Sequence, residues 1–293
     1  MLKLVLLFLF SISNSWSHEY LETKTHIDVY NKSNELKLKY GGKNVLIVFD
    51  IDNTLLKAKQ SLGSDQWFEW EAEAIKTSSA NFRTFEDLLK AQVDFFQLSS
   101  MALTENFIPQ MVQSLKKNGH SIILLTSRSP DLRSVTEREF QRNNLWFADS
   151  SIMGGVPHSF IEHPFKNKIS FMNGIFMTTG HHKGEALAYL LTKARKHFKA
   201  IVFADDHERH TRRVYETFSN LPNIEVVTFR YSKEDEAVTA FKQGSKSHVN
   251  AQLQALLQTS KQIFNKHVRI NALRFCRKMF KGFKALSRTT LGD

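Results

Sequence analysis

The sequence predicts a doubly wound α/β fold, in which a parallel sheet is covered by helices on both faces. One observation is a set of short, unbroken apolar runs rich in β-branched residues, which is typical of strands buried in a parallel sheet. Another is that the segments between these runs have helical patterns, and alternation of strands with helices defines this fold class. With 293 residues and 42% hydrophobic content, the chain can build one large core with an insertion.

The first segment, residues 1–17, has the pattern of a secretory signal peptide. Lys3 precedes the apolar run Leu4 to Phe10, and small residues lead to an expected cleavage point after Ser17. The run is far shorter than the roughly 20 apolar residues that cross a bilayer, so a retained anchor, or an ordinary first strand or helix, is the weaker interpretation. We expect a protein exported to the periplasm or secreted.

Four predicted strands and three predicted helices follow. The strands are residues 45–49, 121–125, 200–204 and 224–229. The helices are residues 107–118, which end before Gly119, then 130–143, which open after Ser129 with Pro130, and 184–198. Ligands of such folds bind at the carboxyl ends of the strands.

An insertion of residues 59–106 separates the first strand from its helix. Its short helical patterns predict a helical cap over the active site. We expect Trp67 and Trp70 to pack in the core of this cap, and a position lining a substrate pocket is the alternative. A second insertion, residues 150–182, carries Asn173-Gly174 between apolar runs, which predicts a β-hairpin. Residues 18–241 then form one domain.

The C-terminal residues 242–293 form a separate basic extension. The formal net charge is +11, and this segment has 11 Lys or Arg against one acidic residue, a net of +10 that leaves about +1 for the rest. Residues 272–288 form a basic amphipathic pattern that suits either an anionic membrane surface or protein partner, or a helix packed on the domain. Nucleic acid is disfavoured for an exported chain without aromatic stacking positions. The single cysteine, Cys276, excludes an intramolecular disulfide and a cysteine-based metal site.

Acidic residues follow two of the predicted strands. Asp50 and Asp52 come after the first strand, where Asp50 could act as a nucleophile and Asp52 could protonate a leaving group and activate water. Asp205 and Asp206 follow the third strand, and with Asp50 they offer the oxygen ligands that Mg²⁺ prefers.

Two further residues suit a phosphate ester. Thr126 ends the second strand, where its hydroxyl and neighbouring amides could hold a phosphate oxygen. Lys183 opens a helix and could offset the negative charge. Arg128 could reach the phosphate or cap the next helix, and we leave it outside the catalytic set.

Four motifs in this order, FDIDNT, LLTSR, HHKGEAL and VFADD, resemble the phosphatase branch of the haloacid dehalogenase (HAD) superfamily, whose sheet is Rossmann-like. The resemblance covers residues 45 to about 232. With LGSDQWFEW and the exported N-terminus, the chain also resembles a little-characterised family of exported bacterial HAD-like proteins. Because haloacid dehalogenases usually lack the second aspartate, Asp52 points to phosphoryl transfer.

The resemblance assigns a role to each motif residue. It implies that Asp50 becomes an aspartyl phosphate and that Asp52 is the general acid and base. It further implies that Thr126 binds the phosphoryl group and that Lys183 stabilises it. It also implies that Mg²⁺ is held by Asp205, the Asp50 carboxylate and the Asp52 backbone carbonyl. Asp206 would help to hold the ion directly or through water.

Four histidines flank these motifs: His181, His182, His207 and His210. They could form a second metal site or contact the substrate, but surface or pocket-rim positions are favoured because the carboxylates already serve a hard cation.

These patterns predict an exported, Mg²⁺-dependent phosphatase that acts on a phosphorylated small molecule or protein. A phosphomutase would share every motif, although export argues against it. The alternative is a secreted binding or effector protein that uses the fold and its basic extension to engage membranes or partner proteins.

Overall fold

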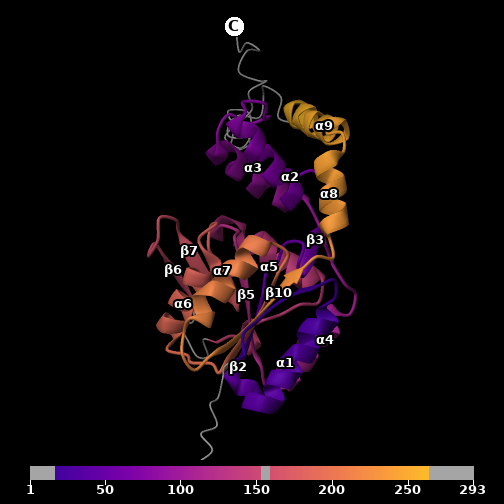
Figure 1. Cartoon of the computed structure of the whole chain (residues 1–293). Helices are drawn as coiled ribbons and strands as arrows, with labels where there is room; N and C mark the ends of the chain where they lie inside the picture. The colour runs from indigo at the N-terminus through magenta and orange to yellow at the C-terminus, as the bar shows by residue number, and fades with distance from the viewer. Residues whose placement is uncertain (1–16, 153–158, 264–293) are drawn as a thin grey trace, which may run out of the picture.

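The computed structural model describes residues 17–152 and 159–263, and a mixed sheet forms its centre (Figure 1). In spatial order the strands are β1 (Glu19–Thr23), β10 (Glu225–Tyr231), β9 (Ala200–Asp205), β2 (Val45–Phe49), β5 (Ser121–Thr126), β8 (Ile175–Met177), β7 (Ile169–Met172) and β6 (Phe160–Glu162). Neighbouring strands from β1 to β8 in this order pair in parallel. β7 pairs antiparallel with β8, and β6 pairs antiparallel with β7. The predicted α/β class with a mostly parallel sheet is confirmed.

The four predicted strands are β2, β5, β9 and β10, and helices cover both faces of the sheet they form. The helices are α1 (His26–Tyr40), α4 (Ile108–Lys117) and α5 (Arg133–Arg142) on one face, with α6 (Lys183–Ala194) and α7 (Glu208–Ser219) on the other. Alternate residues of β2 face the two cores: Ile47 packs with the first set and Val48 with the second. This is why the strand reads as an unbroken apolar run.

Helix boundaries differ from the prediction at two places. The helix expected from residue 130 begins as a 3₁₀ turn over Pro130–Leu132, and α5 follows it. The helix expected to reach residue 198 ends at Ala194, because Arg195 takes a left-handed conformation with φ of 50°.

The first strand and helix, β1 and α1, were not predicted. β1 lies at an edge of the sheet and has one buried residue, Thr23, so its sequence has no apolar run. β1 is a strand because it pairs in parallel with β10, and its own residues do not indicate this pairing.

The predicted hairpin is confirmed at β7 and β8, where Asn173 and Gly174 both have positive φ, 53° and 78°. The hairpin is not a separate insertion, however. Because β8 pairs in parallel with β5, residues 160–177 extend the central sheet.

Between β2 and α4 the chain forms a short antiparallel pair, β3 (Leu56–Ala58) and β4 (Met101–Leu103), and two helices. The helices α2 (Asp65–Lys76) and α3 (Phe85–Leu98) lie together with α8 (Asp235–Gln243) and α9 (Ser247–Ile263) above the sheet (Figure 1). We call these four helices the helical layer.

The helical layer has its own core. Trp67 is fully buried there, with its ring edge-on to the rings of Phe82 and Phe95, and Leu253 of α9 belongs to the same cluster. The side chains of Ser64 and Thr84 cap α2 and α3. Trp67 thus packs as expected.

Two expectations lie outside the described residues: the signal peptide, apart from Ser17, and the basic amphipathic pattern of residues 272–288. Among the helices that the structure describes, none combines the length and apolar content that crossing a membrane requires.

Candidate functional site

The acidic residues predicted at the strand ends come together with Lys183. β9, β2 and β5 are neighbours in the sheet, so Asp205, Asp50 and Thr126 lie at adjacent strand ends. The ammonium Nζ of Lys183, the first residue of α6, lies 2.5 Å from Asp50 Oδ1 and 2.6 Å from Asp205 Oδ2. Lys183, Asp50 and Asp205 are all at least nine-tenths buried, so the charges interact in a medium that screens them weakly.

The turn after β2 is held by backbone contacts. The Asp50 N–H donates to the Ala204 carbonyl at 2.9 Å, which continues the pairing of β2 with β9. Asn53 takes a left-handed conformation with φ of 54°, which asparagine tolerates better than most residues. The Thr54 hydroxyl accepts a hydrogen bond from the Asp206 N–H at 3.0 Å. These contacts join the Asp50 turn to the end of β9.

The ionisation of this group is uneven because one lysine faces several carboxylates. Burial raises the pKa of Asp50 to about 7, although Lys183 opposes the shift. Burial also acts on Asp205, but Lys183 and then His210 outweigh it, and its pKa falls below the ordinary range. Burial raises the pKa of Asp206 well above its ordinary value. Burial thus opposes ionisation at Asp50 and Asp206, whereas Lys183 favours it at Asp205.

The donor atoms fit Mg²⁺. Carboxylate oxygens of Asp50, Asp205 and Asp206 lie within 4.8 Å of one another, and hard divalent cations prefer such ligands. Asp52 was expected to offer its backbone carbonyl to the metal, and its carboxylate binds an arginine.

That arginine is Arg128, which sequence reasoning left outside the catalytic set. Its Nε and Nη2 donate to the two carboxylate oxygens of Asp52 at 2.8 and 2.7 Å, a bidentate pair. Arg128 also donates to Thr136 Oγ1, and its guanidinium carbon lies 4.3 Å from the centre of the Phe96 ring. Its N–H donates to the Thr126 hydroxyl at 3.1 Å. The sequence feature that could have indicated a role for Arg128 is its position two residues after Thr126, the last residue of β5.

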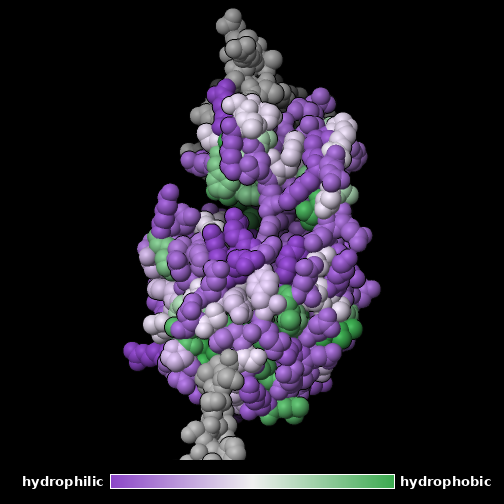
Figure 2. Space-filling view, viewed as in Figure 1, coloured by the Kyte–Doolittle hydropathy of each residue, from purple (hydrophilic) through white to green (hydrophobic). Residues whose placement is uncertain are grey.

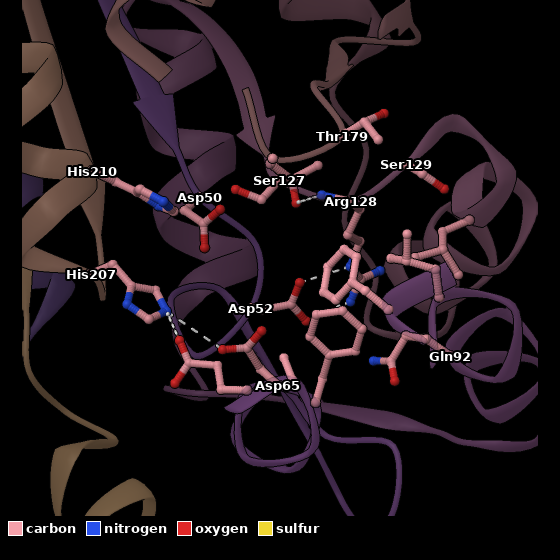
Figure 3. Close-up of a pocket in the computed structure, with 18 of the residues that line it drawn as sticks. Asp50, Asp52, Asp65, Gln92, Ser127, Arg128, Ser129, Thr179, His207 and His210 are labelled. Atoms are coloured by element: carbon pink, nitrogen blue, oxygen red, sulfur yellow. Dashed lines mark hydrogen bonds and ion pairs between the residues drawn. The ribbon is translucent and has the colours of Figure 1, made fainter. Parts of the chain in front are cut away.

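A pocket of about 1010 Å³ lies between the sheet and the helical layer. Figure 2 shows this hollow, with polar surface on the sheet side and apolar surface on the layer side. The four predicted catalytic residues, Asp50, Asp52, Thr126 and Lys183, all line it, as does Asp206. Figure 3 shows Asp50 and Asp52 at its wall with Arg128 bound to Asp52. Asp205 lies behind them and holds Lys183.

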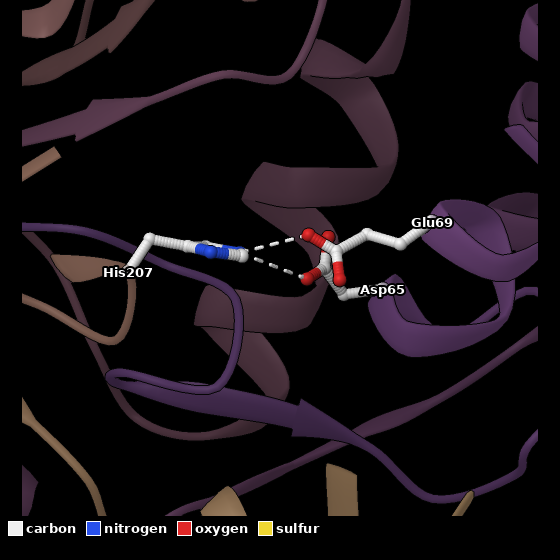
Figure 4. A group of neighbouring side chains, drawn as sticks. All are labelled: Asp65, Glu69 and His207. Carbon is white, nitrogen blue, oxygen red and sulfur yellow. Dashed lines mark ion pairs between the residues drawn. The ribbon is translucent and has the colours of Figure 1, made fainter. Parts of the chain in front are cut away.

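His207 joins the helical layer to the sheet. Its Nε2 lies 3.6 Å from Asp65 and 3.3 Å from Glu69, which are one turn apart on α2 (Figure 4). Burial alone would lower its pKa, but the hydrogen bond to Asp65 and the charge of Asp206 raise the pKa of His207 to about 10. The three side chains have the donor atoms of a metal site, and in this structure they form ion-paired contacts.

The other three histidines take different positions. His182 accepts the Glu185 N–H at the start of α6, and His181 stacks on Phe165. His210 lines the pocket, with Nδ1 3.4 Å from Asp205 Oδ2. Trp70 also lines the pocket, unlike Trp67.

The structure thus defines an α/β protein with an acidic, lysine-bridged pocket at the strand ends. The chain belongs to the family described as "Protein of unknown function (DUF2608)", whose model matches residues 22–265. It is 19% identical over 211 residues to a "Putative outer membrane protein" of Chlamydia trachomatis, covering 70% of this chain and 78% of that protein. It is 20% identical over 209 residues to a protein of Chlamydia pneumoniae with the same description, covering 71% and 75%. No solved structure gives a significant match.

Proposed function

We propose that this protein is an exported, Mg²⁺-dependent phosphatase of HAD type. The observation that carries the proposal is the contact of Lys183 with both Asp50 and Asp205, in a pocket that also holds Asp52. A buried carboxylate beside a fixed cation suits nucleophilic attack on an anionic phosphate ester, which two unpaired carboxylates would repel.

The proposed reaction has two steps. Before the first step, one carboxylate oxygen of Asp52 leaves Arg128 and takes up a proton from water. In the first step, a carboxylate oxygen of Asp50 bonds to phosphorus, the bond to the leaving oxygen breaks, and Asp52 gives that oxygen its proton. In the second, Asp52 takes a proton from water, the water oxygen bonds to phosphorus, and Asp50 is released with phosphate. Lys183 and the Thr126 hydroxyl hold the phosphoryl oxygens throughout.

The resident cation would be held by Asp50, Asp205 and Asp206, with the Asp52 backbone carbonyl as a further ligand. When bound, Mg²⁺ would neutralise charge that develops on the phosphoryl oxygens. Arg128 fixes the direction of the Asp52 carboxylate through two hydrogen bonds, so Arg128 is a positioning residue.

We propose that the helical layer is the cap of this phosphatase. It closes the pocket on the side opposite the strand ends, and the segments that enter and leave it pair as β3 and β4. The cap then includes α8 and α9 as well as residues 59–106.

Export follows from the pattern of residues 1–17 and agrees with the names of the Chlamydia relatives. A periplasmic or secreted location is the proposal.

Hydrolysis of a generic aryl phosphate by the purified protein tests the chemistry, with Mg²⁺, with chelator, and in Asp50→Asn. We expect turnover only with Mg²⁺ and Asp50. The matched control is Asp131→Asn, because Asp131 is an exposed carboxylate that lies outside the pocket. Mg²⁺-independent turnover, or full activity in Asp50→Asn, would contradict the proposal.

A further inference from the structure

One wall of the pocket is apolar and belongs to α3. Phe85, Leu89, Val93 and Phe96 all line the pocket, and their spacing of three or four residues places them on one helical face. Phe85 is 50% and Leu89 is 36% exposed. Large apolar side chains exposed inside a pocket are typical of a ligand surface.

This wall lies where a leaving group would emerge. Phe96 contacts the guanidinium of Arg128, and Arg128 binds the carboxylate of Asp52. If Asp52 protonates the leaving oxygen, as the proposed function states, the group attached to that oxygen must leave the reaction centre beside Asp52. Phe96 reaches this place through its contact with Arg128, and the apolar row continues along α3 toward Leu89 and Phe85.

The adjoining wall, on α2, is mixed. Asp65, Glu69 and Glu73 line the pocket at intervals of four residues, together with Phe68 and Trp70 of the same helix. The acidic side chains have partners, because His207 and Lys242 pair with Glu69 at 3.3 and 3.0 Å and Lys76 pairs with Glu73. The ring of Phe68 lies edge-on to that of Phe85, so the apolar surface of α3 continues onto α2.

We infer that the substrate is a phosphate monoester of a bulky apolar alcohol, alkyl or aryl. This inference rests on the proposed function and names its substrate class. The apolar row removes hydrocarbon from water, whereas the hydroxyls of a sugar would lose hydrogen bonds to water.

The ratio of kcat/KM for octyl phosphate to that for methyl phosphate tests the inference. We expect a ratio well above one in the wild type and roughly tenfold lower in Leu89→Asn, because one apolar contact in a pocket commonly changes discrimination by that factor. The matched control is Leu98→Asn: Leu98 is on the same helix, 65% exposed and outside the pocket lining. We expect the control to keep the wild-type ratio.

A binding measurement separates this inference from the proposed chemistry. Calorimetric titration with octylphosphonate and methylphosphonate, which have no ester bond to cleave, should show tighter binding of the octyl compound and a loss in Leu89→Asn. Such binding without turnover of any ester would overturn the proposed phosphatase and leave the apolar pocket selectivity standing. Equal ratios in Leu89→Asn and Leu98→Asn, or no preference for the octyl chain, would overturn the inference.

Discussion

The floor and the roof of the pocket are built in opposite ways. The floor, at the strand ends, holds Asp50, Lys183 and Asp205, all buried and joined by ion pairs. The roof, on α3, presents exposed apolar side chains such as Phe85 and Leu89 on a layer that has its own core. Changes in the floor should therefore alter chemistry and stability together, whereas changes in the roof should alter selectivity with little effect on the sheet.

The largest effect is expected for Lys183→Met. It leaves Asp50 and Asp205 buried beside each other without their cation, so unfolding in urea should show a loss of about 3 to 5 kcal/mol, and turnover should become undetectable. Lys193→Met is the matched control on α6, because Lys193 pairs with Glu162 at the surface, and it should cost less than about 1 kcal/mol. Equal costs for the two variants would mean that the floor is not held by its charges.

Acid should weaken the sheet layer through buried histidines. Burial lowers the pKa of His26, of His120 and of His210 to about 4, below the ordinary value near 6.5. A depressed folded-state pKa gives stability that is present above pH 6.5 and is lost as pH falls from 6.5 to 4, and His26 alone accounts for about 3 kcal/mol.

Urea unfolding at pH 7, 5.5 and 4.5 would measure this loss in wild type and in His26→Gln. The variant should lose less stability between pH 7 and 4.5, with His120 and His210 contributing to the remaining slope. An unchanged slope would show that His26 is not held neutral in its contacts with Tyr231 and the Thr54 carbonyl.

Arg128→Lys should lower kcat about 100-fold, which is the scale of a general acid's contribution, because a lysine cannot hold Asp52 bidentately. KM should change much less, since the phosphate is held by other groups. Arg142→Lys is the control at an exposed arginine on α5. A larger effect on KM than on kcat would instead assign Arg128 to substrate binding.

The smallest expected effect concerns the roof. Ser64→Ala removes the side-chain cap of α2, which should cost about 1 kcal/mol. Amide hydrogen exchange should quicken in α2 and α3 but not in α1. Thr25→Ala, which removes the cap of α1, should show the reverse, and exchange that quickens throughout in either variant would mean that the two layers unfold as one unit.

Sequence reasoning could reach the floor because its signals are local. Each of the four residues proposed as catalytic follows an apolar run or opens a helix, and parallel strands bring their carboxyl ends together. The sequence indicated only part of the roof, residues 59–106, since Leu253 of α9 joins the cluster of Trp67 from nearly two hundred residues away. Arg128 was left outside the catalytic set because its place in the sequence does not show whether its guanidinium binds Asp52, a phosphate or the end of a helix. β1 was missed because its pairing partner is β10.

The pairing of β1 with β10 has a consequence for folding order. Residues 19–23 are made first during synthesis, and their neighbours, residues 225–231, are made among the last of the described strands. Loop closure over such a separation is slow compared with local contacts. Until β10 is made, β1 has no strand beside it, so this edge of the sheet is completed only after Asp50, Lys183 and Asp205 have all been made.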